Sequence, residues 1–504
     1  MRRAASGAAA LFAAALAAGC ATVADPYTVA PADAQLAADG ELGDCLRRLQ
    51  AFDARIDEAG VRDAQAVRVP GYPYLRVDRY TATRAPQGAD AQALTRARIE
   101  RMAALDAEAR GYEAANARVP AEQMDALQRC RAQLVAAAAA DASRVTAAAQ
   151  VPDAYDDSMR MLGLYPMARI PFSWGVAGYQ QAVRELYATP FPEIAVRGQR
   201  IRYVPAPLAA PGDSVAGLLA SDTQTAAAFA MRALSPAAAW TLLQQHAPVL
   251  VVDTVDDNDR IGRLAWRISG DQLYVAAQVS EPGAYVRVAW TEFGGAAALQ
   301  LVYTFWFPAR PAATPFDPQA GRLDGLMWRV TLDAAGRPLV YDSIHPCGCF
   351  HLFFPTENVR ERPQPIAGEG SLDETMFAPQ VVHSPGPNER MLVFVSSGDH
   401  QIQRVAVDQP LPAPGEPYAL ADENGLRALP LPAAAGGGTR SIFGPDGLVP
   451  GTERTERFMY WPMGIPSAGQ MRQWGHHATA FVGRRHFDDP HLMDRYFTLA
   501  PGLD

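Results

Sequence analysis

Lysine is absent from this chain of 504 residues, and all 45 basic residues are arginine. The chain therefore cannot form a lysine Schiff base, a phosphate loop with its lysine, or a Ser-x-x-Lys nucleophile. Three further motifs are missing: Gly-x-Ser-x-Gly, Gly-x-Gly-x-x-Gly and His-Glu-x-x-His. Their absence removes the usual signatures of a serine hydrolase, a dinucleotide-binding loop and a zinc-protease helix. The motifs in the sequence therefore do not identify a reaction.

Positive charge is also scarce, because 54 acidic residues give the chain a net charge of −9. A nucleic-acid-binding protein would show a concentrated basic patch, and we find none. We therefore expect no nucleic-acid partner.

Long apolar runs are missing except at the N-terminus. There Arg2 and Arg3 precede an apolar stretch over residues 8–18, which ends in Ala17-Ala18-Gly19-Cys20. A basic start, a short apolar core and a small-residue end are typical of an export signal, and the stretch is too short to span a bilayer. It resembles the lipobox of bacterial lipoproteins, although Ala17 stands where a leucine is usual. An ordinary secreted protein cleaved nearby is the alternative.

The lipobox resemblance implies cleavage after residue 19 and acylation of Cys20, which would anchor the chain to a membrane. A residue other than aspartate after the cysteine, here Ala21, implies the outer membrane facing the periplasm. Buried acyl methylenes would hold the protein there at roughly 0.8 kcal/mol each. Residues 20–40 are small and polar and would act as a tether, and the mature chain would carry a net charge of −11.

Cysteine is rare, with five residues in all. If Cys20 carries lipid, an even number remains in an oxidising compartment, which favours disulfides. Cys45 and Cys130 each lie in the apolar stripe of a predicted helix, with apolar residues at three- and four-residue steps. We predict that these two cysteines form a disulfide that stabilises the chain by roughly 4–5 kcal/mol. Two buried free thiols are the alternative.

The periodicity of the apolar residues divides the chain. Residues 41–150 predict helices, residues 69–75 an aromatic loop, and residues 151–246 a mixed connector whose helices include 153–164, 176–186 and 235–245. From residue 247 to 504 the period changes to two, with strands near 286–290, 299–307 and 328–332 and a long loop at about 430–456. We expect an α+β protein, in which a helical N-terminal region precedes a mainly antiparallel, sandwich-like β domain.

The segment Tyr341-Asp-Ser-Ile-His-Pro-Cys-Gly-Cys-Phe-His351 is the richest in chemistry. His345, Cys347, Cys349 and His351 alternate, so an extended strand would place all four on one face. Imidazole and thiolate are ligands of zinc and copper, but four positions spanning about 20 Å of strand cannot reach one ion unless the chain turns. A Cys347–Cys349 disulfide and two free thiols are the alternatives.

A second histidine cluster lies near the C-terminus. His477 falls in an alternating stretch that predicts a late strand, and His486, Asp488 and Asp489 follow it. The alternative is a polar loop with exposed imidazoles. If this strand packs beside the Cys-Gly-Cys segment, histidines from both could form one metal site, with Asp488 or Asp489 orienting an imidazole. Three protein ligands would leave a position for water and permit hydrolysis, whereas a closed site would be structural.

A short region is similar to secreted necrosis-inducing proteins. It comprises residues 299–307 and Gly321-Arg-Leu-Asp-Gly-Leu-Met-Trp328. The similarity covers about a tenth of the chain and implies a β-sandwich. Leu323 and Arg329 stand where that family would have a histidine and a glutamate ligand, so its metal site does not carry over.

Three functions are compatible with these patterns. The first is an outer-membrane-anchored lipoprotein whose β domain binds a metal, zinc or copper, or a small ligand. The second is a metal-dependent hydrolase of the cell envelope, and the third is a scaffold without small-molecule chemistry. All chemical interpretations require residues 345–351 and 476–491 to meet in space.

Overall fold

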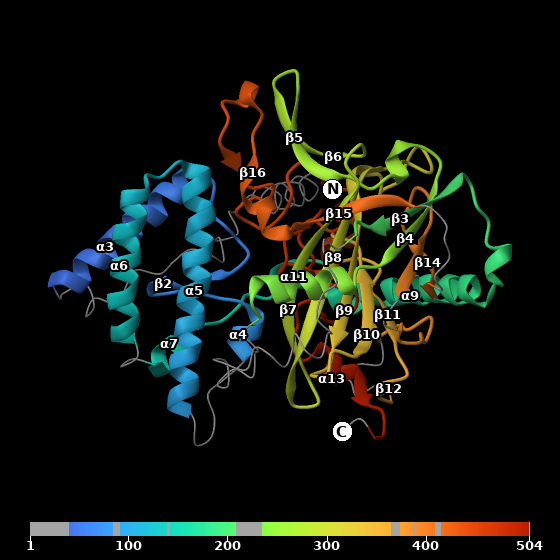
Figure 1. Cartoon of the computed structure of the whole chain (residues 1–504), viewed down its shortest axis with the longest axis horizontal. Helices are drawn as coiled ribbons and strands as arrows, with labels where there is room; N and C mark the ends of the chain where they lie inside the picture. Colours follow the sequence, from blue (N-terminus) through green and yellow to red (C-terminus); the bar gives the residue numbers. More distant parts are fainter. Residues whose placement is uncertain are drawn as a thin grey trace, which may run out of the picture.

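The computed structural model describes residues 40–83, 91–138, 142–207, 234–363, 373–386, 389–408 and 415–502. The predicted export signal, Cys20 and the tether up to residue 39 lie outside these ranges. The chain is an α+β protein, as predicted, with a helical N-terminal region beside a domain built on one large sheet (Figure 1). Within the described ranges, no helix combines the length and apolarity needed to cross a bilayer.

The N-terminal region packs helices around a β-hairpin. Its apolar core takes side chains from three long helices and both strands of the hairpin. The elements are α3 (Gly40–Glu58), β1 (Val67–Val69), β2 (Tyr72–Val77), α4 (Arg79–Thr83), α5 (Ala91–Ala117), α6 (Ala121–Ala138) and α7 (Ala142–Ala148). The hairpin corrects our prediction of an aromatic loop at 69–75. Gly71 adopts a φ of +82° at its turn, and the strands are rich in valine and tyrosine, which favour this conformation.

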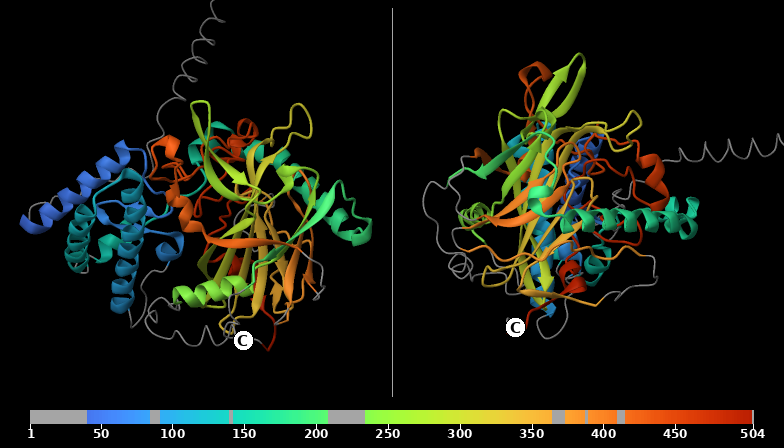
Figure 2. Two further views of the ribbon diagram at one scale, coloured as in Figure 1. Left: turned by 45° about the horizontal axis from the view of Figure 1, so that its top comes forward. Right: turned by 90° about the vertical axis from the view of Figure 1, so that its right-hand side faces the viewer.

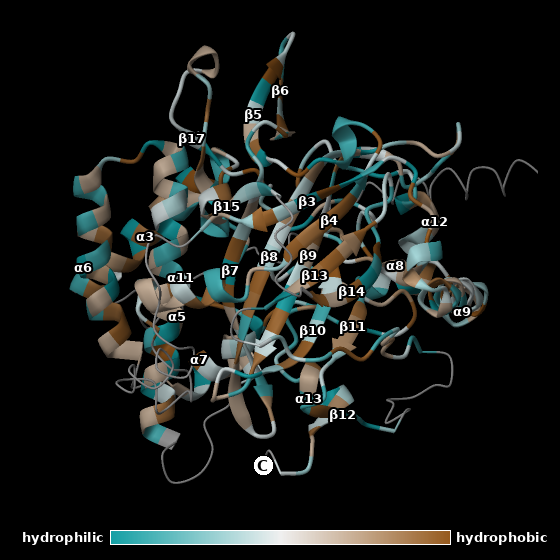
Figure 3. Ribbon diagram, turned by 45° about the vertical axis from the view of Figure 1, so that its right-hand side comes forward, coloured by the Kyte–Doolittle hydropathy of each residue, from teal (hydrophilic) through white to brown (hydrophobic). Residues whose placement is uncertain are grey.

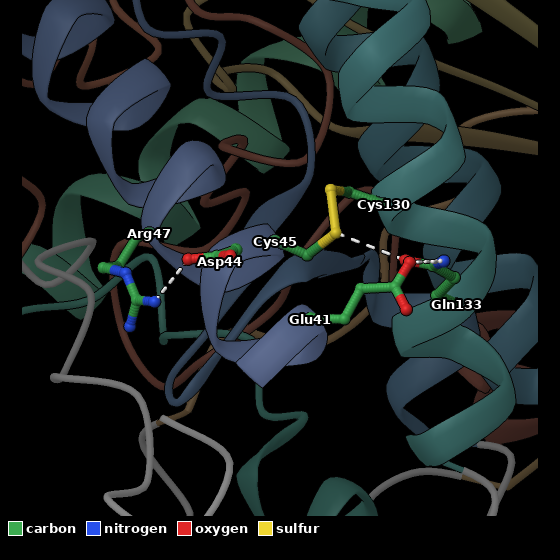
Figure 4. The surroundings of a disulfide bond; sticks show 6 residues. All are labelled: Glu41, Asp44, Cys45, Arg47, Cys130 and Gln133. Carbon is green, nitrogen blue, oxygen red and sulfur yellow. Dashed lines mark hydrogen bonds and ion pairs between the residues drawn. A yellow bond between two sulfur atoms is a disulfide. The ribbon is translucent and has the colours of Figure 1, made fainter. Parts of the chain in front are cut away.

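The predicted disulfide is present and joins α3 to α6. The sulfurs of Cys45 and Cys130 are 2.01 Å apart, and the two Cα atoms are 5.1 Å apart (Figure 4). Gln133 lies beside the bridge and donates to Glu41 at 2.7 Å, which adds a second link between the helices. The prediction is confirmed. Apolar residues at three- and four-residue steps form the buried face of each helix, and each cysteine lies on that face.

Buried ion pairs connect the hairpin to α5. Arg76 of β2 donates to Glu113 at 2.6 Å, and Arg110 contacts Asp106 at 2.9 Å and Asp53 of α3 at 2.8 Å. Both arginine side chains are fully buried. Loss of one member would leave charges unpaired away from water, which is strongly unfavourable.

Three helices of the connector are longer or shorter than predicted. They are α8 (Asp157–Leu162), α9 (Tyr165–Ala188) and α11 (Pro236–Gln245). Helix α9 begins eleven residues before the predicted start at 176. Pro166 does not prevent this, because it occupies the first turn, where a helix needs no N–H donor.

The β domain is organised by a ten-stranded sheet. The spatial order is β11-β10-β9-β8-β7-β15-β3-β4-β13-β14, and neighbours are antiparallel except at the β7–β15, β15–β3 and β4–β13 pairs. The strands are β3 (Gln199–Pro205), β4 (Val249–Thr254), β7 (Gly283–Phe293), β8 (Ala296–Arg310), β9 (Gly321–Leu332), β10 (Pro338–Ile344), β11 (Leu352–Pro355), β13 (Arg390–Val395), β14 (Ile402–Asp408) and β15 (Glu416–Asp422).

Both faces of the sheet are covered. Leu301, Tyr303 and Phe305 of β8 point to one face and pack with α11, whereas Val302 and Trp306 point to clusters on the opposite face. This alternation is the one that predicted the strand. Helix α9 lies along the outside of the β domain at one edge, away from the N-terminal helices (Figure 2).

Short elements complete the domain. They are η2 (Phe191–Glu193), η3 (Asp257–Asp259), β5 (Arg263–Ser269), β6 (Gln272–Gln278), β12 (Val359–Glu361), η4 (Glu423–Ala428), β16 (Leu429–Pro430), η5 (Ala433–Ala435), β17 (Thr439–Arg440), α12 (Arg457–Tyr460), η6 (Trp461–Met463), α13 (Leu492–Tyr496) and β18 (Phe497–Leu499). The region predicted as a loop at 430–456 thus includes β17 and part of β16.

The predicted late strand around His477 is wrong. Residues 476–482 form an irregular segment with one isolated bridge, between Ala478 and His486. Its backbone bonds partly to other irregular segments, as where the Thr479 N–H donates to Arg485 O at 2.8 Å. Side chains satisfy the rest: the Ala480 N–H donates to the Tyr155 hydroxyl at 3.1 Å, and the Phe481 N–H donates to Glu374 at 2.8 Å. The alternating apolar residues of this segment are buried, although the segment is not a strand of a sheet.

Candidate functional site

The Cys-Gly-Cys segment is a tight turn between β10 and β11. The Gly348 N–H donates to His345 O at 2.8 Å, and the His345 N–H donates to Cys349 O at 3.0 Å. Gly348 has a φ of +94°, and a Cβ there would lie 2.3 Å from Ala478 O. Only glycine permits so close an approach. The turn therefore packs directly on the C-terminal histidine segment, so residues 345–351 and 476–491 are in contact.

The two cysteines of this turn are free thiols and are both buried. The Cys349 N–H lies 3.4 Å from Cys347 Sγ. A hydrogen bond with Cys347 and burial raise the pKa of Cys349 well above its usual value, so this group stays a thiol at neutral pH. A protonated, buried thiol is a weak nucleophile and can donate a hydrogen bond.

His351 lies at the end of the turn and pairs with a buried acid. Its Nε2 is 2.9 Å from Asp342 Oδ2, and Asp342 also accepts from Arg329 Nε at 2.8 Å. Burial alone would raise the pKa of Asp342, but Arg329 and His351 outweigh it and lower the value. Burial lowers the pKa of His351 to about 3. Because an ionised carboxylate only accepts, Nε2 carries the proton and Nδ1 presents a lone pair.

His345 belongs to a different group. Its Nδ1 lies 3.5 Å from Asp324, and Asp324 in turn lies 2.8 Å from His400 Nδ1. His400 Nε2 is 3.3 Å from Asp259, and its ring stacks on Phe307. Burial disfavours the charged imidazole, but the hydrogen bonds to Asp259 and Asp324 exceed this and raise the pKa of His400. This buried network holds β9, η3 and the segment after β13 together.

The C-terminal residues are dispersed among separate partners. His477 is buried, and burial lowers its pKa to about 3. His486 Nε2 contacts Asp153 at 2.9 Å. Asp488 pairs with Arg79 at 3.2 Å and Asp489 pairs with Arg495 at 2.6 Å. The acids that orient imidazoles are therefore Asp324, Asp342 and Asp153 instead of the predicted Asp488 and Asp489.

This dispersal bears on the expected metal centre. Among the residues that the structure describes, no group of three or more histidine, cysteine, aspartate or glutamate side chains lies close enough to hold a metal ion. Zinc or copper binding by the histidines and cysteines stays a prediction.

A cavity of about 590 Å³ lies where the turn, α9 and the C-terminal segment meet. A typical site for a small molecule has roughly 300–1,000 Å³ and a mainly apolar lining with few polar groups. The lining residues are Pro171, Phe172, Gly175, Val176, Tyr179, Gln180, Gln319, Cys347, Gly348, Cys349, Phe350, His351, Glu374, Phe377, Gln401, Met459, Tyr460, Ile465, Ala468, Gly469, Ala478, Thr479, Ala480 and Phe481. Cys347, Cys349 and His351 thus share one cavity, whereas His345, His477 and His486 do not line it.

Two polar atoms of the lining residues are buried without a hydrogen-bond partner among the described residues: the hydroxyl of Tyr179 and Nδ1 of His351. A buried polar atom left unpaired costs about 1–3 kcal/mol. The acid in the lining is already satisfied, because Glu374 accepts from Arg485 at 2.7 Å and from the Phe481 N–H. Neither atom is accessible from the cavity, and the His351 side chain is 0 % exposed, so His351 lines the cavity through its backbone.

Sequence reasoning missed Tyr179, Glu374 and Asp342. Asp342 was detectable only with the strand register, because it lies directly opposite Arg329 in the β9–β10 pair. Tyr179 falls on the inner face of α9 together with Phe172 and Val176, at helical spacing that was obscured by the two prolines.

Comparison of the chain with protein-family profiles, characterised proteins and solved structures gives no match.

Proposed function

We propose that this chain is a lipid-anchored envelope protein whose β domain binds a small, mainly apolar molecule in the cavity lined by the Cys-Gly-Cys turn. The observation that carries the proposal is the cavity of about 590 Å³, which is lined by apolar side chains such as Phe172, Val176 and Phe481. An apolar molecule would fill this space.

The anchor rests on the lipobox resemblance. Replacement of Cys20 by serine should abolish incorporation of radiolabelled palmitate and move the protein out of the membrane fraction. Retained label would refute acylation at this residue.

The cavity is tested with two glycines of the same helix. A Cβ added at Gly175 or at Gly178 would meet no atom within 4 Å, but only Gly175 lines the cavity. Both Gly175→Trp and Gly178→Trp should fold, because most residues favour a helix more than glycine does.

N-phenyl-1-naphthylamine is a suitable probe, since it is apolar and fluoresces in apolar surroundings. Wild type and Gly178→Trp should bind it with equal affinity, and Gly175→Trp should lose binding. Equal binding by both variants, or none by wild type, would overturn the proposed site.

A further inference from the structure

Helix α9 is apolar on both sides. Phe172, Val176 and Tyr179 face inward and line the cavity. On the opposite side, Met167, Ile170 and Trp174 are 69 %, 40 % and 70 % exposed. A helix that is apolar all round normally lies buried in protein or in a membrane. Its outer side here faces solvent.

Neighbouring elements extend this exposed surface. The ring centroids of Phe172 in α9 and Tyr460 in α12 are 5.3 Å apart, which places the two helices side by side. Figure 3 shows α8, α9 and α12 together at one edge of the molecule. We call the exposed apolar side chains of this region the α9 surface: Met161, Leu162, Leu164, Met167, Ile170, Trp174, Phe458, Met459 and Trp461.

The α9 surface is continuous with the cavity. Met459 belongs to both, and Pro171 and Gly175 line the cavity between exposed neighbours on the same helix. A protein partner would need only the outer side of α9 to be apolar. A ligand that moves from an apolar phase outside the protein into the cavity requires both the outer and the inner side of α9 to be apolar.

Acidic residues are absent from this segment. Residues 158–184 contain no aspartate or glutamate, although the whole chain has a net charge of −9. Of the three arginines in the segment, Arg160 is buried and Arg169 lies 3.7 Å from Asp373, whereas Arg184 is exposed. Exposed tryptophan, methionine and leucine without acidic neighbours in the sequence are typical of a segment that lies in the interface of a bilayer.

We propose that the α9 surface lies on a lipid bilayer and that the cavity takes up a single-chain lipid from it. The inference rests on the proposed function of the cavity and names its ligand class and source. The acyl chain would pass along the inner side of α9, against Phe172, Val176 and Tyr179.

Two tryptophans allow contact with the bilayer to be measured on the full acylated chain. Trp174 lies on the α9 surface, and Trp240 of α11 is also exposed but lies elsewhere. The protein is placed in vesicles of phosphatidylcholine and phosphatidylglycerol that contain a dibrominated phosphatidylcholine, which quenches tryptophan on contact. Trp461 also belongs to the α9 surface and is 37 % exposed. Trp174→Phe should therefore remove part of the quenching and Trp174→Phe/Trp461→Phe most of it, whereas Trp240→Phe should leave it unchanged.

Uptake is measured with pyrene-labelled monoacylglycerol in the same vesicles without bromine. Met167→Ser/Ile170→Ser should slow uptake by roughly ten-fold or more, because two large apolar side chains no longer enter the lipid. Phe316→Ser, which changes a side chain that is 93 % exposed elsewhere, should not slow it. Wild type, Met167→Ser/Ile170→Ser and Phe316→Ser should bind N-phenyl-1-naphthylamine in solution with the same affinity.

The outcomes separate the two proposals. If wild type does not bind N-phenyl-1-naphthylamine, the proposed binding function of the cavity is refuted. Normal dye binding without quenching through Trp174 would refute bilayer contact alone. A dimer in sedimentation that Met167→Ser/Ile170→Ser dissociates, with no quenching, would assign the α9 surface to a second copy and overturn the inference.

Discussion

His351 Nε2 lies 2.9 Å from Asp342 Oδ2, and this contact determines what the opposite side of the imidazole can do. Asp342 is held by Arg329 on the neighbouring strand and stays ionised, because the arginine and His351 lower its pKa. The imidazole therefore keeps its proton on Nε2 and leaves an acceptor at Nδ1. Because the His351 and Asp342 side chains are wholly buried, the pair acts inside the protein, where it fixes the end of the Cys-Gly-Cys turn to β10.

The first prediction concerns this buried pair. Asp342→Asn should lose about 3–5 kcal/mol of unfolding free energy, because it leaves the buried Arg329 guanidinium without its carboxylate. Urea denaturation measures the loss. Asp44→Asn is the control and should lose less than about 1 kcal/mol, since the Asp44–Arg47 pair is exposed. Equal losses in the two variants would contradict the buried position of the pair.

The second prediction concerns the disulfide. Cys45 and Cys130 are separated by 85 positions, so the Cys45→Ser/Cys130→Ser variant should lose about 4–5 kcal/mol of unfolding free energy in the chain-entropy model. Urea denaturation followed by far-ultraviolet circular dichroism measures the loss. Reduction of wild type should reproduce it. A change below about 1 kcal/mol would show that the bridge does not stabilise the helical region.

The third prediction concerns pH. Unfolded histidine takes up a proton near pH 6.5, whereas burial holds the pKa of His477 at about 3 in the folded chain. The unfolded state thus binds more protons between these values, and stability falls as the pH drops below 6.5. From pH 7 to pH 5 this residue should cost about 2 kcal/mol of unfolding free energy.

His477→Gln should remove that part of the pH dependence in urea titrations at the two pH values. His383→Gln should retain it, because the His383 side chain is exposed. An unchanged pH dependence in His477→Gln would mean that the imidazole is not buried in its neutral form.

Regular elements with repeated spacing were predictable. The apolar stripes of α3 and α6 recur over several turns, and they correctly paired Cys45 with Cys130. The N-terminal half of α9 was missed because Pro166 and Pro171 suggested a break. A proline in the first turn costs a helix little, and this position could not be recognised before the helix start was known.

The site was predictable only in part. Sequence alone made contact between the Cys-Gly-Cys segment and the C-terminal histidine segment a condition of a shared site, and it could not show that the two segments meet. The pairs His351–Asp342 and His486–Asp153 could not be predicted. In each pair the contact depends on strand register or loop packing, which the sequence does not reveal. The cavity itself depends on α9, whose inner face was not recognised.

The most direct test of ligand binding is a chain-length series. Isothermal titration of 1-hexanol, 1-octanol, 1-decanol and 1-dodecanol should show affinity that rises about four-fold for each added methylene, equivalent to about 0.8 kcal/mol, until the cavity is filled. Gly175→Trp should bind none of them measurably, and Gly178→Trp should follow wild type. Affinity that does not depend on chain length, or a series that Gly175→Trp leaves intact, would contradict an apolar binding cavity at the Cys-Gly-Cys turn.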